Sequence, residues 1–190
     1  MVNNMYYDVI MAGFGGQGIM LMADFLALIA MKEGKNVTWM PSYGVEMRGG
    51  TANCTVIVSS EEIGSPITGH PFSTIVMNEP SLIKYEPMVK ENGFLLINSS
   101  LIDPKKTIRK DLDKILLPAN TIAKDLGNTQ MANMVALGAF IEKTRIVSLD
   151  LTIKSLPEIF PNRPSNFIIN NSRAMEKGAE FASREIQRAL

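Results

Sequence analysis

The sequence predicts a three-layer α/β domain of Rossmann-like type, with helices on both faces of a mixed, mainly parallel sheet. Three observations predict it. A glycine loop joins an apolar strand to a long apolar helix, short strand-length segments then alternate with helical ones, and the last third is helical. Strands alternating with helices are typical of such layered folds. We therefore expect one domain over residues 1–190, with an α/β core at about 5–127 and a helical part at about 128–190.

The first 70 residues justify the start of this fold. Residues 6–12 lack polar alternation, which indicates a central buried strand, and residues 19–32 are apolar nearly all round, which indicates a helix covered on more than one side. Residues 37–40 should form a second strand, parallel to the first through a right-handed crossover. The alternating segment 51–59 predicts a third strand, followed by a hairpin turn into a short antiparallel strand at 63–67 that would make the sheet mixed.

The remaining elements complete the sheet and its helices. The expected strands are 74–77, 94–97 and 115–117. The expected helices are 82–89, 121–126, 129–143, 150–160 and a final one from about 165. Pro80 suits the first turn of a helix, and Pro157 should distort the one that contains it. The final helix places apolar side chains on one face and pairs Glu180 with Arg184 on the other.

Composition excludes several classes of function. Nineteen basic and nineteen acidic residues cancel, which predicts neither nucleic acid nor an acidic membrane as partner. The longest apolar run is interrupted by Asp24 and is shorter than the roughly 20 residues of a membrane-spanning helix. No secretory signal is evident at the N-terminus, so a cytoplasmic location is expected. One cysteine, Cys54, and one histidine, His70, leave too few ligands for an iron–sulfur cluster or structural zinc.

The glycine loop is the first candidate ligand site. Gly13, Gly15 and Gly18 satisfy the pattern G-x-G-x-x-G, with Gly16 and Gln17 inside it. Glycine allows positive φ and close approach of the backbone to a ligand, and the start of the following helix favours an anionic group. The alternative is a tight strand-to-helix turn that only the fold requires.

A second candidate group follows the other strands. In an open α/β sheet, ligands bind outside the carboxyl ends of the strands, which adds Asn78, Asn98 and the glycine-rich loop after the second strand. Capping of the next helix is the stronger alternative for the two asparagines. The loop carries Tyr43, Glu46 and Arg48, and the guanidinium of Arg48 suits a phosphate or carboxylate. An ion pair of Arg48 with Glu46 or with another subunit explains the same residues.

The glycine pattern alone would suggest a nicotinamide dinucleotide enzyme. That class expects an acidic residue at the end of the second strand, about twenty residues further on. The strand ends here in Thr-Trp-Met-Pro at 38–41, and Glu33 precedes the strand. This departure weighs against dinucleotide binding. The sequence also holds no nucleophile elbow, zinc-protease motif or Walker loop, so no catalytic residue and no metal ligand is assigned.

Two segments together are more specific than the glycine pattern. They are Gly-Phe-Gly-Gly-Gln-Gly at 13–18 and Pro-Ser-Tyr-Gly-Val-Glu-Met-Arg-Gly-Gly-Thr-Ala-Asn-Cys at 41–54. Both resemble the gamma subunit of 2-oxoacid:ferredoxin (acceptor) oxidoreductases, and the form is most similar to the 2-oxoglutarate type (2-oxoglutarate synthase). The junctions at 78–82, 98–100 and 118–120 are also similar, so the resemblance covers nearly the whole chain.

The resemblance implies one subunit of a larger enzyme. In that family a 2-oxoacid is decarboxylated on thiamine diphosphate, electrons leave through 4Fe-4S clusters to ferredoxin or another acceptor, and coenzyme A takes the acyl group. This chain lacks the Gly-Asp-Gly…Asn signature for thiamine diphosphate and Mg²⁺, as well as cluster cysteines. Those groups are therefore expected on alpha, beta and ferredoxin-like delta subunits, and the isolated chain is expected to be inactive.

The role that the resemblance implies for this chain is a wall of the active-site cleft and a surface for coenzyme A. The residues expected to contribute are Gly13, Gly15, Gly16, Gln17, Gly18, Ser42, Tyr43, Glu46, Arg48, Gly49, Gly50, Asn53, Asn78 and Asn98. Two alternatives stay open, a purely structural assembly subunit and a stand-alone Rossmann-type dehydrogenase. The sequence does not determine the oxoacid or the physiological acceptor.

Overall fold

The sheet has six strands in the order β2-β3-β1-β4-β5-β6. The computed structural model describes residues 5–43 and 50–189. The strands are β1 (Tyr6–Phe14), β2 (Asn36–Tyr43), β3 (Thr51–Ser59), β4 (Ser73–Val76), β5 (Phe94–Asn98) and β6 (Asp113–Leu117). β1, β4, β5 and β6 are successive parallel neighbours, and β3 is antiparallel to both β1 and β2. The carboxyl ends of β1, β2, β4, β5 and β6 therefore share one edge with the start of β3.

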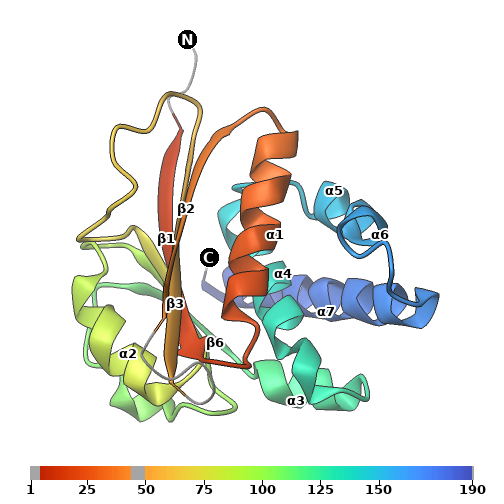
Figure 1. The fold of residues 1–190 in the computed structure, drawn as a ribbon. Helices are drawn as coiled ribbons and strands as arrows, with labels where there is room; N and C mark the ends of the chain where they lie inside the picture. Colours follow the sequence, from red (N-terminus) through yellow and green to blue (C-terminus); the bar gives the residue numbers. More distant parts are fainter. Residues whose placement is uncertain (1–4, 44–49, 190) are drawn as a thin grey trace.

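Helices cover both faces of this sheet unequally (Figure 1). They are α1 (Ile19–Lys32), α2 (Glu79–Tyr85), α3 (Ala119–Asp125), α4 (Ala132–Thr144), α5 (Leu149–Lys154), α6 (Leu156–Ile159) and α7 (Ser165–Ala189). Figure 1 shows α2 on one face and α1, α4 and α7 on the other. The predicted three-layer arrangement with a helical C-terminal third is confirmed.

Alternation along β1 divides the core into two parts. Val9 and Met11 pack with α1 and α4, whereas Ile10 and Ala12 pack with α2 and its neighbours. Successive strand residues point to opposite faces, so a strand buried on both sides must be apolar throughout. α1 is apolar for a similar reason, because it is covered on one side by the sheet and on the other by the C-terminal helices. Phe25 of α1 is fully buried there.

Two details of the sheet differ from the prediction. β2 runs in the same direction as β1 but does not pair with it, because β3 lies between them. The predicted strand at 63–67 does not form, and Ile67 is 68% exposed there. Gly64 and Pro66 explain this, since proline cannot donate to a ladder and glycine weakens a strand. The sheet is mixed, as predicted, but the antiparallel strand responsible is β3.

The helices begin and end close to the predicted proline and glycine positions, with small shifts. Pro80 lies in the first turn of α2, which ends earlier than predicted and continues as a short 3-10 turn at 86–88. The segment 150–160 divides into α5 and α6 at Ser155, with Pro157 in the first turn of α6. Gly34 follows α1 at φ 76°, and the Glu180–Arg184 pair on α7 has an N–O distance of 3.8 Å. In the described part of the chain, no helix combines the length and the apolar character needed to cross a membrane.

α4 and α7 pack with their backbones in direct contact. A Cβ on Gly138 of α4 would lie 2.0 Å from the carbonyl oxygen of Met175, and one on Gly178 of α7 would lie 1.9 Å from that of Val135. Both distances are far below van der Waals contact, so only glycine fits at either position. This close crossing determines where the first turns of the two helices stand beside the glycine loop.

Candidate ligand site at the carboxyl edge of the sheet

The glycine loop connects β1 to α1 at the edge where the parallel strands end. Gly16 and Gly18 have φ of 98° and 73°, which L side chains rarely adopt. The N–H of Gly15 donates to the carbonyl oxygen of Gly50 at 2.9 Å, so the loop is tied to the start of β3. The two predicted motifs therefore meet in space.

Gln17 holds the loop against β4. Its Oε1 accepts the N–H of Phe14 at 2.6 Å, and its Nε2 donates to the carbonyl oxygen of Met77 at 3.0 Å. The amide of Asn78 approaches the same Oε1 at 3.5 Å. Both polar ends of Gln17 are thus engaged with the protein itself, which gives this residue a positioning role; contact with a ligand stays a prediction.

The glycines of the motif divide into two kinds. A Cβ on Gly13 would lie 2.6 Å from Oε1 of Gln17, and one on Gly18 would lie 2.3 Å from Nδ2 of Asn133. These two glycines are explained by packing within the chain. A Cβ on Gly16 would meet nothing within 4 Å. Of these three glycines, Gly16 is therefore the one that leaves room for an approaching ligand.

The start of α1 adds hydrogen-bond donors beside Gly16. Within 5–43 and 50–189, no protein acceptor meets the N–H of Ile19, Met20 or Leu21, and the first helical bond is that of Met22 to the carbonyl oxygen of Gly18 at 3.1 Å. Free N–H groups and the helix dipole give this end a partial positive charge. The loop and the helix start can together bind an anionic group such as a phosphate.

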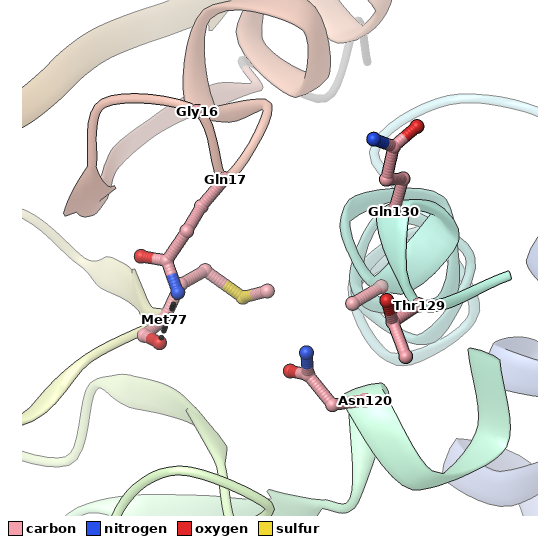
Figure 2. A pocket seen from close by; sticks show the side chains of 7 residues that line it. Gly16, Gln17, Met77, Asn120, Thr129 and Gln130 are labelled. Carbon is pink, nitrogen blue, oxygen red and sulfur yellow. Dashed lines mark hydrogen bonds between the residues drawn. The ribbon is translucent and has the colours of Figure 1, made fainter. Parts of the chain in front are cut away.

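Three cavities open around Gly16, with volumes of about 200, 450 and 510 Å³. Figure 2 shows the smallest, with Gln17 and Met77 on one side, Thr129 and Gln130 on the other, and Asn120 between them. It lies outside the ends of β1 and β4, where strand order reverses and ligands of α/β proteins commonly bind. The second cavity shares Gly16 and Gln130 with the first and extends toward α7, and the third is the more apolar.

The two predicted asparagines contact protein groups. Asn78 caps α2, because its Oδ1 accepts the N–H of Ser81 at 2.9 Å. Asn98 is fully buried and caps no helix, and its Nδ2 donates to Oδ1 of Asn120 at 2.7 Å. Neither lines the three cavities, although Asn98 supports Asn120, which lines the first. The capping alternative is confirmed for Asn78.

The second motif reaches the same edge through β2 and β3. Ser42 is exposed near the end of β2 and lies opposite Asn53 of β3, which in turn lies opposite Ala12 of β1. Tyr43 is the last residue of β2. Three predicted site residues lie outside the described residues: Glu46, Arg48 and Gly49. Their contribution to the site stays a prediction.

Several cavity residues were not among those predicted. Asn120 follows β6, so the rule of strand ends, together with the junction at 118–120, pointed to it. Asn133 on α4 and Arg163 and Phe167 near the start of α7 line the second cavity. They come from the helical third, more than 100 residues after the glycine loop, and no local motif marks them.

The donor set of this chain does not fit the metal and thiamine groups of the resembling enzymes. Among the described residues, no three His, Cys, Asp or Glu side chains converge to hold a metal ion. Cys54 is fully buried, and burial raises the pKa of its thiol to about 12. His70 contacts the carbonyl oxygen of Met88 at 3.3 Å, before β4 and at the opposite edge of the sheet. A 4Fe-4S cluster requires cysteine thiolates that this sequence does not contain.

Comparison with known proteins supports the resemblance carried by the two motifs. The family model described as pyruvate ferredoxin/flavodoxin oxidoreductase matches residues 8–181. The ketoisovalerate oxidoreductase subunit VorA of Methanothermobacter marburgensis is 34% identical over 93% of this chain, which spans only 36% of that relative. The 2-oxoglutarate synthase subunit KorC of Methanocaldococcus jannaschii is 31% identical over 92% of this chain and 93% of its own length.

Solved structures agree in fold. The gamma subunit of keto/oxoacid ferredoxin oxidoreductase from Geobacter sulfurreducens PCA superposes with a TM-score of 0.79 at 30% identity, over 94% of this chain and 99% of the other. The 2-oxoglutarate:ferredoxin oxidoreductase of Magnetococcus marinus, with 2-oxoglutarate, coenzyme A and succinyl-CoA bound, contains the same fold; its TM-score is 0.88 at 23% identity, over 94% of this chain and 31% of that one. With the family match across residues 8–181, these findings show that this chain belongs to the pyruvate ferredoxin/flavodoxin oxidoreductase family.

Proposed function

We propose that this chain is the gamma subunit of a 2-oxoacid:ferredoxin oxidoreductase. The enzyme would oxidatively decarboxylate its oxoacid, releasing carbon dioxide and forming an acyl-CoA. Family membership and the match to KorC along nearly the full length of both chains support this assignment. We further propose 2-oxoglutarate as the substrate, because the second motif has the form of the 2-oxoglutarate type. The match to VorA makes ketoisovalerate the first competing substrate to test.

The observation that carries the proposal is the open space at Gly16. This residue lines all three cavities, a Cβ on it would touch nothing, and free N–H groups of α1 stand beside it. A diphosphate requires such a combination of backbone access and positive potential. Coenzyme A carries a diphosphate between its nucleotide and its thiol arm. The chain would bind this group and orient the thiol toward the reacting oxoacid on a partner subunit.

The division of chemistry between subunits follows from the residues present. Thiamine diphosphate with Mg²⁺ supplies decarboxylation when bound, and iron–sulfur clusters supply electron transfer to the acceptor. The donor set of this chain fits none of them, so we assign them to alpha, beta and delta partners. The chain's own contribution is to bind coenzyme A, orient it and exclude water from one side of the cleft.

The direct test is gentle affinity purification of this chain from its own host, followed by sequencing of the co-purifying chains. We expect partners with Gly-Asp-Gly and cysteine-rich ferredoxin motifs, bound iron and thiamine, and acceptor reduction that depends on both an oxoacid and coenzyme A. A chain that purifies alone and is stabilised against heat by a nicotinamide dinucleotide would overturn the proposal in favour of the stand-alone dehydrogenase.

The oxoacid specificity can be measured on the same affinity-purified enzyme. Rates of acceptor reduction with 2-oxoglutarate, ketoisovalerate and pyruvate at equal concentrations should be highest with 2-oxoglutarate. A higher kcat/KM for ketoisovalerate would reject the proposed substrate and leave the subunit assignment intact. The oxoacid pocket is expected mainly on the partner chains, so the comparison requires the assembled enzyme.

Arg48 is a proposed contact of a coenzyme A phosphate, and a purely structural role at a subunit interface is the competing explanation. Arg48→Ala in the assembled enzyme should raise the KM for coenzyme A and leave the subunits associated. The matched control is Arg173→Ala, which removes an exposed arginine of α7 that does not line the cavities. Dissociation of the Arg48→Ala enzyme, or an unchanged KM and kcat, would reject the ligand contact.

A further inference from the structure

We propose that the outer edge of β2 is an interface through which two copies of this chain pair, strand against strand, across a two-fold axis at Thr38. This inference goes beyond the proposed function, because it concerns the association of the chain with itself and involves no ligand. β2 is a terminal strand of the sheet, and β3 is its one neighbour among the described strands. A terminal strand presents unpaired backbone N–H and C=O groups, which are a template for another strand.

The hydrogen bonds of the sheet identify the backbone groups of β2 that point outward. The N–H of Ser60 donates to the carbonyl oxygen of Met5 at 2.9 Å, and in this register the even-numbered residues of β3 bond to β1. Bonding groups alternate in direction along an antiparallel strand, so the odd-numbered residues of β3 bond to the even-numbered residues of β2. The N–H and C=O groups of Val37 and Trp39 therefore point away from the sheet.

The composition of β2 is that of a strand that pairs on both sides. None of its eight residues, Asn36–Tyr43, is charged. β6, at the other end of the sheet, carries Asp113 and Lys114, and charged side chains of this kind protect an edge from pairing. Pro41 has no N–H to donate, so the first half of β2 is the part that is open to another strand.

The two outward-pointing residues determine the register. With Thr38 on a two-fold axis, Val37 of one copy lies opposite Trp39 of the other, and each such pair exchanges two backbone hydrogen bonds. An axis further along the strand would place Pro41 inside the ladder and lose a bond. An uncharged strand brings no like charges together across the axis, and a two-fold contact between identical surfaces is the commonest way in which subunits pair. These features favour a second copy of this chain as the occupant.

The residue on the axis lacks a hydrogen-bond partner in the single chain. Oγ1 of Thr38 is buried, and no group in the part of the chain that the structure describes bonds to it. The two copies of Thr38 would form a non-hydrogen-bonded backbone pair, in which the Cα atoms are about 4.5 Å apart and the side chains are in contact. Threonines that lie opposite each other share a hydroxyl hydrogen bond, so rotation about χ1 would give this oxygen a partner.

Apolar side chains flank the strand on the face that α1 covers (Figure 1). Trp39 is 40% exposed and lies opposite Val56, which packs on that face. Burial, and then the carboxylate of Asp24 in α1, raises the pKa of the Cys54 thiol, so Asp24 faces the β2 end of the sheet. Leu28, one turn further on, shares that side of α1 and is 42% exposed. A second copy would cover both apolar side chains.

The first test is the oligomeric state of the full chain, measured by sedimentation equilibrium over a dilution series. We expect a reversible equilibrium between a monomer of 20.9 kDa and a dimer of twice that mass. Thr38→Lys should raise the Kd of the dimer about a hundredfold, because two like charges would then face each other about 5 Å apart. Ile108→Lys is the matched control, which adds the same charge at a position that is 72% exposed in the segment before β6; it should leave the Kd unchanged.

The discriminating test is disulfide formation between copies, which reports the register. Thr38→Cys should link two chains on mild oxidation, because the expected Cα distance lies within the range of about 4.4–6.8 Å that disulfides span. Met40→Cys, two residues further along the same face, should not link, because its two copies would lie about 13 Å apart. The native Cys54 is fully buried and should not compete.

Trp39 gives a third measurement, because it is the one tryptophan of the sequence. Its emission should shift to the red on dilution. A chain that stays monomeric at every concentration, a dimer that Thr38→Lys leaves unchanged, or a Thr38→Cys chain that does not link overturns the inference. Protection of Trp39 only in the assembled enzyme, without the Thr38→Cys link, overturns it as well and assigns the edge to another subunit. Failure of the proposed function is read separately, from the partners and oxoacid-dependent activity of the purified complex.

Discussion

The crossing of α4 and α7 offers a prediction whose size follows from the geometry. In Gly138→Ala the new methyl group would lie 2.0 Å from the carbonyl oxygen of Met175, and real Cβ contacts essentially never fall below 3.0 Å. The helices must therefore separate by about 1 Å, because neither backbone can rotate away. Overpacking lowers the free energy of unfolding by about 1–3 kcal/mol, whereas replacing glycine by alanine inside a helix raises it by about 1 kcal/mol. Since the clash is with backbone, we expect a net loss of about 2 kcal/mol.

Urea and thermal unfolding of the full chain measure this loss. A loss of about 2 kcal/mol corresponds to a fall in Tm of about 4–8 °C for a domain of this size. Gly64→Ala is the matched control, because a Cβ there would meet nothing within 4 Å and its φ is not positive. We expect that variant to lie within about 0.5 kcal/mol of the wild type. If Gly138→Ala unfolds at the same urea concentration as Gly64→Ala, the close crossing does not exist as described.

Three further predictions concern the site and the buried thiol. Gly18→Ala should lower the free energy of unfolding in urea by about 2 kcal/mol or more, because of the positive φ and the clash with Asn133. Gly16→Ala should lower it by about 1 kcal/mol and mainly raise the KM for coenzyme A in the assembled enzyme. Equal effects of the two substitutions would contradict the division of the glycines. Gln17→Leu should lose about 2 kcal/mol, about 1 for each of its two hydrogen bonds, and a variant as stable as the wild type would show that the loop does not depend on them. Burial raises the pKa of the Cys54 thiol to about 12 from its ordinary 9, so the folded state binds the proton more tightly than the unfolded state. The free energy of unfolding should therefore be unaffected below pH 9 and fall as pH rises from 9 toward 12. Alkylation of Cys54 at pH 8 should be slow until the chain unfolds. Rapid alkylation of the native chain would show that the thiol is accessible.

Local signals predicted the first βα unit well. The helix at 19–32 matches α1, because an apolar face, a preceding glycine loop and Gly34 after its end all act within a few residues. The third strand was predicted with the bounds of β3 for the same reason, since alternation and β-branched residues are properties of the segment itself. Its position between β1 and β2 was not predicted. Strand order depends on contacts between distant segments, and a short-range pattern does not contain it.

The candidate site divides in the same way. Gly16 and the other loop glycines were identifiable because backbone conformation leaves a local signature in the sequence. Asn133, Arg163 and Asn171, which line the second cavity, were not, because each is an ordinary polar residue in a helix or in the turn before one. Their significance arises only when α4 and α7 pack back against the start of α1. The packing that brings them there depends on Gly138, whose local effect is merely to weaken a helix.

These contacts form one continuous path from the loop to the last helix. Gly18 contacts Asn133 at the start of α4, and Gly138 in the middle of that helix contacts the backbone of α7, which carries Asn171. Every step is a backbone or short side-chain contact, so it can take up little displacement without strain. A methyl group at Gly138 should therefore widen the second cavity as well as destabilise the fold. A higher KM for coenzyme A in the assembled enzyme that carries Gly138→Ala, measured well below its Tm, would show that the C-terminal helices contribute to ligand binding as well as to the core.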